Sequence, residues 1–203
     1  MNLEERGTEG QLLSIVVPVY NEQPNIEKFY MEATKAAATL DMDYELIFVD
    51  DGSKDATPLI LSRLAQEDEH VRAFILARNF GHQLAITCGM DHARGDAIIT
   101  MDGDLQHPPE MIPDLVQKWR DGSDVVQTIR EATDDAGFLK KQTSKWYYRV
   151  LNAVSPVHIT PGGSDFRSLT EGFWKHLNNF ANTTVLSAAL SGISVITRPL
   201  FVL

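Results

Sequence analysis

The chain has 203 residues, 43% of them hydrophobic and 23% charged, which suits one globular α/β domain with a substantial buried core. Its formal net charge of −10, from 28 acidic and 18 basic residues, argues against nucleic acid as a partner, because such binding needs a basic surface. The single cysteine, Cys88, excludes an intrachain disulfide framework and a zinc cluster built on cysteines. We interpret it as a small core residue of a protein from a reducing, cytoplasmic compartment.

The hydropathy pattern predicts neither a leader nor a membrane helix. Residues 1–11 are polar and acidic, as in a flexible tail, and lack the apolar core of a signal peptide. The apolar stretch at 185–203 is interrupted by serines, Arg198 and Pro199, and falls short of the roughly 20 apolar residues of a membrane span. We expect a helix there that turns at Gly192 into a final strand.

Apolar stretches with β-branched residues alternate with segments of helical spacing along the first 130 residues. The predicted strands are 12–18, 44–49, 71–77, 97–101 and 124–129. The predicted helices between them are 24–40, 56–69, 82–93 and 109–120. Strands separated by helices indicate βαβ units, so we expect one domain with a mostly parallel sheet flanked by helices.

The second half of the chain has a different character. Residues 131–137 are polar and acidic and are predicted as a surface loop. Residues 140–154 are predicted to form a basic, aromatic helix, which would either bury its aromatic side chains and solvate its charges or meet an anionic surface or lipid head group. Gly162 and Gly163 allow close approach of a ligand to the backbone, and Asp165 stands at the start of a short predicted strand.

Asp102 and Asp104 directly follow the predicted strand 97–101. Two carboxylates two residues apart in extended chain project to the same side, so both can face one cation. Oxygen ligands of this kind suit Mg²⁺ or Mn²⁺, which keep positions open for water and substrate phosphates. Gly103 leaves the backbone between them free to turn. The alternative is a solvated acidic turn, which would have no ligand.

Two further polar clusters follow predicted strands: Asn21 and Glu22 after the first, and Asp50 and Asp51 after the second. Either could be turn or helix-cap chemistry, but the carboxyl ends of parallel strands meet at one edge of a sheet, so all three clusters together predict a site. The sequence contains neither G-x-G-x-x-G after the first strand nor G-x-x-x-x-G-K-[ST]. Phosphate binding through a metal and scattered side chains points to a nucleotide-sugar enzyme.

A family resemblance rests on five motifs that follow one another along the chain. They are residues 17–22, 49–57, 77–83, 101–109 and 163–167. They resemble the family 2 glycosyltransferases of the GT-A fold, and within these the polyprenyl-phosphate group of dolichol-phosphate mannose synthase and bactoprenol glucosyltransferase. The resemblance implies a Rossmann-like single domain at 12–203 behind a tail at 1–11. Its nucleotide-sugar and metal half would be 12–130, and its acceptor half 131–203.

The resemblance also implies roles for individual residues. Those that would line the nucleoside pocket are Pro18, Tyr20, Glu22, Val49 and Asp51, with Asp51 reaching the base or ribose. Those at the diphosphate and metal would be Asp102 and Gly103 against the diphosphate, and Asp102, Asp104 and Gln106 on the metal. Residues 78–81 would shape the donor pocket. Arg130 would face the diphosphate, although an exposed arginine at a strand end is the alternative. Asp165 would be the catalytic base, and Asp104 is the second residue expected to be catalytic.

The function implied is a metal-dependent, inverting transfer of sugar from a UDP- or GDP-sugar to a polyprenyl (undecaprenyl or dolichyl) phosphate, for cell-surface glycan or glycoconjugate synthesis. Mg²⁺ or Mn²⁺ would be the cofactor. The protein would act in the cytoplasm, at the cytoplasmic face of a membrane. The sequence leaves open whether it forms a homo-oligomer. Three alternatives remain: a glycan or soluble hydroxyl acceptor, an inactive nucleotide-binding remnant or partner-binding domain, and a nucleotidyltransferase, whose glycine- and lysine-rich loop is missing after the first strand.

Family members continue beyond the segment matching 163–167 with an R-x-x-G-x-S-K loop, an amphipathic helix and often membrane helices. The present sequence stops at Leu203, about where that loop is expected. The pattern therefore suggests a catalytic domain truncated at its C-terminus or a divergent short member.

Overall fold

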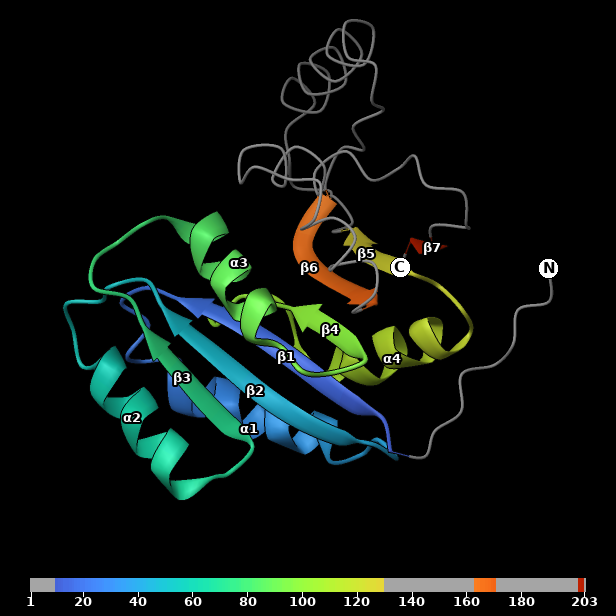
Figure 1. Cartoon of the computed structure of the whole chain (residues 1–203), viewed down its shortest axis with the longest axis horizontal. Coiled ribbons are helices and arrows are strands. Elements are labelled where there is room, and N and C mark those ends of the chain that lie inside the picture. Colours follow the sequence, from blue (N-terminus) through green and yellow to red (C-terminus); the bar gives the residue numbers. More distant parts are fainter. Residues whose placement is uncertain (1–9, 130–162, 171–200, 203) are drawn as a thin grey trace, which may run out of the picture.

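The computed structural model describes residues 10–129, 163–170 and 201–202. Within these residues, one seven-stranded sheet carries helices on both faces (Figure 1). The strands are β1 (Leu12–Val19), β2 (Asp43–Asp50), β3 (Val71–Ile75), β4 (Ala97–Thr100), β5 (Val125–Ile129), β6 (Gly163–Thr170) and β7 (Phe201–Val202). The helices are α1 (Ile26–Ala37), α2 (Thr57–Glu67), α3 (His82–His92) and α4 (Ile112–Arg120), with a short 3-10 helix, η1 (Pro109–Met111), before α4. The predicted strands and helices of the first 130 residues are confirmed.

The sheet order is β3-β2-β1-β4-β6-β5-β7. β1 pairs in parallel with β2 and β4, and β2 pairs in parallel with β3, so the mostly parallel α/β sheet is confirmed. β6 runs antiparallel between β4 and β5. Sequence order alone suggests that β4 and β5 are neighbours, but β6 returns from far along the chain and separates them.

The two faces of the sheet bury different sets of side chains, because alternate residues of a strand point to opposite faces. Leu13, Ile15 and Val17 of β1 pack in the larger core with α1, α2 and α4. Val16 packs in the smaller core on the other face, which α3 covers (Figure 1). Gly89 permits this close packing, since a Cβ there would collide with the side chain of Val16. Cys88 is partly buried against the same core, and burial raises the pKa of its thiol.

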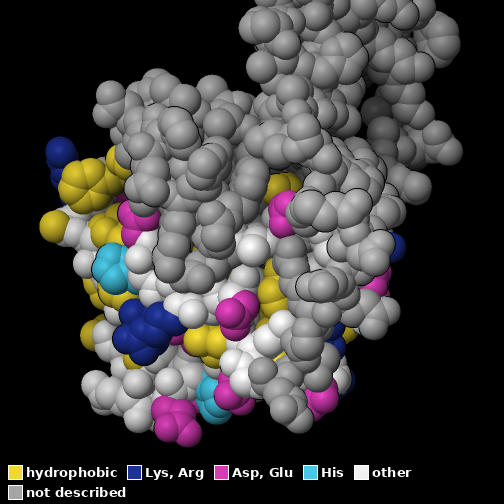
Figure 2. Space-filling view, turned by 45° about the vertical axis from the view of Figure 1, so that its right-hand side comes forward, with side chains coloured by type: hydrophobic (Ala, Val, Ile, Leu, Met, Phe, Trp, Pro, Cys, Tyr) yellow, Lys and Arg dark blue, Asp and Glu magenta, His cyan; other side chains and the backbone are white. Residues whose placement is uncertain are grey.

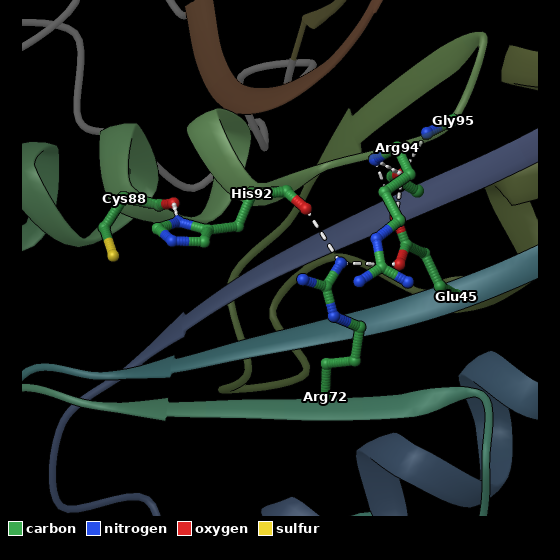
Figure 3. Close-up of polar contacts among 7 residues, drawn as sticks. Glu45, Arg72, Cys88, His92, Arg94 and Gly95 are labelled. Carbon is green, nitrogen blue, oxygen red and sulfur yellow. Dashed lines mark hydrogen bonds and ion pairs between the residues drawn. The ribbon is translucent and has the colours of Figure 1, made fainter.

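A partly buried polar network lies at the edge of the sheet where the parallel strands begin (Figure 3). The Ser14 hydroxyl donates a hydrogen bond of 2.6 Å to Glu45 Oε1, and the Arg72 guanidinium donates one of 2.8 Å to Glu45 Oε2. The same Arg72 nitrogen also lies 2.8 Å from the His92 carbonyl oxygen. The backbone amide of Arg94 donates to Glu45 Oε1 over 2.8 Å. Glu45 therefore ties β1, β2 and β3 to the end of α3.

On the described part of the face in Figure 2, acidic side chains are scattered and basic ones form no continuous patch, in keeping with the net charge of −10.

None of the helices in the described ranges has both the length and the apolar character needed to cross a bilayer.

Several expectations fall outside the described residues. They concern the tail at 1–9, Arg130, the loop at 131–137, the helix at 140–154 and the helix within 185–200.

Replacing Glu45 by alanine should lower the free energy of unfolding by about 2 kcal/mol, because the buried Ser14 hydroxyl loses its acceptor and the partly buried Arg72 guanidinium loses its charged partner. Urea unfolding followed by circular dichroism measures this. The matched control is Glu32→Ala, since Glu32 makes an exposed ion pair with Lys28 at 3.8 Å, and should lose at most about 0.5 kcal/mol. Equal losses in the two variants would refute the structural role of Glu45.

Candidate functional site

A pocket of about 350 Å³ opens at the edge of the sheet where β1, β2 and β4 end. Its lining residues are Pro18, Val19, Tyr20, Glu22, Asp51, Asn79, Gly81, His82, Ala85, Asp102, Gly103 and Asp104. They come from the end of β1, from the loops after β1, β2, β3 and β4, and from the start of α3. The structure therefore brings the three strand ends together at one edge of the sheet, as the sequence predicts.

Most residues expected at the donor site line this pocket: Pro18, Tyr20, Glu22, Asp51, Asp102, Gly103 and Asp104. Val49 does not line it. Its side chain is fully buried in the core under α3, because it alternates with Phe48 and points to the α3 face of the sheet. Gln106 is exposed and stands next to the pocket wall rather than in it.

The loops after β1 and β2 are held together by hydrogen bonds that connect side chains to backbone. The backbone amide of Asn21, a residue with a φ of 55°, donates to the Ser53 hydroxyl over 2.7 Å. The Asn21 side-chain oxygen accepts a hydrogen bond of 2.8 Å from the Lys54 amide. The Glu22 amide donates over 3.0 Å to the Thr57 hydroxyl. These bonds fix the loop that carries Tyr20 and Glu22 into the pocket.

Asp50, the last residue of β2, supports the contact between the loops after β1 and β2. Its carboxylate is buried and accepts hydrogen bonds from the Ser53 amide and hydroxyl. Burial raises the pKa of Asp50, and the bonds from Ser53 oppose that rise. We assign Asp50 to the support of the loop.

Asp51 is only 3% exposed, and both its carboxylate oxygens accept backbone hydrogen bonds. The Phe80 amide donates to Oδ1 over 2.7 Å, and the Gly81 amide donates to Oδ2 over 2.9 Å. Gly52, with a φ of +72°, makes room for this loop, since a Cβ there would lie 2.7 Å from the Asn79 nitrogen. Asp51 therefore anchors residues 78–81 directly before the start of α3.

The loop that carries the two acidic residues after β4 lies tightly against β1. A Cβ on Gly103 would lie 2.7 Å from Val19 Cγ1, so the close approach requires glycine. Asp104 Oδ1 accepts a 2.9 Å hydrogen bond from the Gln106 amide, and Leu105 has a φ of 61°. Asp102 Oδ1 lies 3.6 Å from His82 Nε2 on the opposite pocket wall.

The chemistry of these donors fits a hard divalent cation that shares its shell with a ligand. Asp102 and Asp104 are partly exposed on the pocket wall and offer carboxylate oxygens. Across the described ranges there is no group of three or more His, Cys, Asp or Glu side chains that could hold a metal ion. A cation such as Mg²⁺, which retains water and takes oxygens from substrate phosphates, suits a site with two carboxylates.

The pairing of β6 brings Asp165 toward the same region. Thr100 pairs with Arg167 in antiparallel register, so the residues before Arg167 run past the end of β4, where Asp102 follows. Asp165 belongs to β6, as the sequence predicts, and by this register it lies beyond the end of β4. Arg130 lies outside the described residues, directly after β5.

Val19, His82 and Ala85 of the pocket lining were missing from the residues expected at the site. Val19 ends β1, and His82 and Ala85 lie in the first turn of α3. The signal that could have identified the last two is their position at the start of the helix that follows a parallel strand, since such a helix begins at the ligand edge of the sheet.

Comparison with known proteins identifies the family. The family model described as "Glycosyl transferase family 2" matches residues 14–187. The chain belongs to this family. Two curated relatives of this family-2 chain are an uncharacterised glycosyltransferase of Bacillus subtilis (strain 168) and a prophage bactoprenol glucosyl transferase homologue of Escherichia coli (strain K12). The first is 44% identical over 76% of this chain and 48% of its own length. The second is 41% identical over 78% of this chain and 52% of its own length.

The chain thus spans about half the length of the curated relatives it matches. Among solved structures, a mannosyltransferase from Pyrobaculum calidifontis in complex with GDP-Man and Mn²⁺ matches 96% of this chain and 56% of its own, with a TM-score of 0.60 at 20% identity. This likeness establishes the GT-A fold for the family-2 chain.

Asp51→Ala should lower the free energy of unfolding by about 2 kcal/mol, because it leaves the Phe80 and Gly81 amides without their acceptor. Thermal and urea unfolding measure the change. Asp41→Ala, at an exposed position, is the matched control and should change stability by less than about 0.5 kcal/mol. If both variants unfold alike, Asp51 does not hold the loop.

Proposed function

We propose that this chain is the catalytic domain of a metal-dependent, inverting glycosyltransferase that moves sugar from a nucleotide sugar to a polyprenyl phosphate such as undecaprenyl phosphate. The observation that carries this is the pocket that joins Tyr20, Asp51, Asp102 and Asp104 at one sheet edge in a family 2 chain. The name of the related bactoprenol glucosyl transferase homologue supports the lipid-phosphate acceptor. Such an acceptor would bring the protein to the cytoplasmic face of a membrane.

The charges of the pocket support a cation between protein and donor. The described lining includes four carboxylates, those of Glu22, Asp51, Asp102 and Asp104, and neither lysine nor arginine. These carboxylates would repel a diphosphate. Charge balance therefore favours a divalent cation on Asp102, Asp104 and Gln106.

The donor would lie along the pocket with its two ends at different walls. Pro18, Tyr20 and Asp51 would surround the nucleoside, with Asn79 beside them. Gly103 would let the diphosphate approach the backbone closely. A bound Mg²⁺ or Mn²⁺ would offset the negative charge that develops on the departing nucleoside diphosphate. Arg130 would add a positive charge to the same leaving group.

The acceptor would attack the anomeric carbon from the face opposite the leaving diphosphate, which inverts its configuration in one displacement. A phosphate monoester has a second pKa near ~6, so it is largely ionised at neutral pH and needs little help from a base. Asp165 would then orient the acceptor more than deprotonate it. A sugar hydroxyl would instead need a true general base.

Nucleotide binding should depend on a divalent cation and on Asp104. We expect Asp104→Asn to weaken binding of UDP or GDP at least about tenfold in Mn²⁺, because a lost carboxylate ligand costs cation affinity and with it diphosphate affinity. Isothermal titration with and without EDTA measures this. Asp121→Asn, which alters an exposed carboxylate at the end of α4, is the control. Equal nucleotide affinity of the unmodified chain in EDTA and in Mn²⁺ would contradict the proposal.

Asp165→Asn should reduce sugar transfer while leaving nucleotide affinity within a few-fold. With a phosphate acceptor the loss should be smaller than the ~10²–10⁴-fold typical of a general base. The measurement is transfer of radiolabelled sugar to a short-chain polyprenyl phosphate and, in parallel, to simple sugars. Transfer to a sugar hydroxyl with none to the lipid phosphate would overturn the lipid-phosphate acceptor and favour a glycan or soluble acceptor.

A further inference from the structure

His82 occupies a distinctive position in the pocket. It is the first residue of α3, its side chain is 42% exposed, and its Nε2 lies 3.6 Å from Asp102 Oδ1. That separation exceeds a hydrogen bond, so the two groups make a loose electrostatic contact across the pocket. His82 therefore bridges the wall built by α3 and the wall built by the loop after β4.

The backbone around His82 is held from both sides. The Gly81 amide is bonded to Asp51, and the Gly81 carbonyl accepts hydrogen bonds from the Leu84 and Ala85 amides at 3.0 and 3.2 Å. The start of α3 is thus fixed to the end of β2. The imidazole consequently projects from a rigid base into a pocket whose described lining has few donors, namely the side chains of Tyr20, Asn79 and His82 besides backbone amides.

We infer that His82 binds the diphosphate of the sugar donor and that its place beside Asp102 couples this contact to cation binding. The inference rests on the proposed function. The phosphate oxygens that approach a cation on Asp102 must also approach the imidazole, which stands 3.6 Å from the same carboxylate. An imidazole Nε2–H donates a hydrogen bond in its neutral tautomer and in its charged form alike, so the contact needs no change in protonation.

The cation matters because it changes what the imidazole faces. Without a cation, His82 faces the negative carboxylate of Asp102. With a cation, that carboxylate is engaged, and the oxygens drawn to the cation become the acceptors within reach. His82 therefore strengthens diphosphate binding only when the cation is present, and it contributes nothing to the nucleoside.

The experiment compares nucleotide and nucleoside binding in His82 variants of this chain. The probes are UDP and GDP, each compared with its own nucleoside, in Mn²⁺ and in EDTA. Ligand-observed NMR measures the nucleosides, which bind weakly. In Mn²⁺, His82→Ala should weaken diphosphate binding about tenfold, as expected for a hydrogen bond to a charged group, and change nucleoside binding less than twofold. In EDTA the two proteins should bind the diphosphate alike.

Two further variants separate binding from structure. His82→Gln keeps a side-chain donor and should recover part of the lost affinity, whereas Gln83→Ala, at the exposed neighbouring position outside the pocket lining, should behave like the unmodified chain. Manganese affinity without nucleotide should not fall in His82→Ala. Equal loss for nucleoside and diphosphate, loss in EDTA as in Mn²⁺, or no loss at all would overturn the inference. If the unmodified chain bound neither UDP nor GDP in Mn²⁺, the proposed function itself would fail.

Discussion

The pair of hydrogen bonds from the Phe80 and Gly81 amides to Asp51 is the interaction on which the candidate site depends. It joins the end of β2 to the start of α3 and so closes one wall of the pocket. It also places a carboxylate directly before the first turn of α3, where a negative charge repels an anion. In the proposed function the donor's phosphates would therefore lie toward the opposite wall, where Asp102 and Asp104 stand.

The rigidity of that wall comes from both ends of α3. The residues directly before its first turn are bound to Asp51, and its last carbonyl, that of His92, is bound to Arg72 and through it to Glu45 (Figure 3). Between these ends Gly89 lets the helix lie directly on β1. A helix fixed at two opposite edges of the sheet cannot shift without breaking these polar contacts, so a side chain in its first turn is held in register with the strand ends.

The elements and the general place of the site were predictable because they depend on local pattern. β-branched stretches, helical spacing and acidic residues after strands located β1 to β5 and the pocket edge. The position of β6 was not predictable, since strand order depends on pairing between distant segments. The same holds for the bonds to Asp51, whose donors are backbone amides, and for Val49, whose orientation follows from which sheet face α3 covers. The type of a residue alone does not reveal such partners.

The acidity of this site is itself an argument about mechanism. Both proposed substrates are anions, yet the described pocket lining supplies four carboxylates and no permanently charged base. A protein that bound diphosphate directly would place lysine or arginine there. An acidic lining instead makes affinity conditional on a cation, and it disfavours a bare nucleotide in the cation's absence. Asp51, with both oxygens bonded to amides, adds to this repulsion while serving structure. In the proposed function cation and donor would therefore arrive as a linked pair, and Asp102, with His82 beside it, would be the group through which that linkage acts.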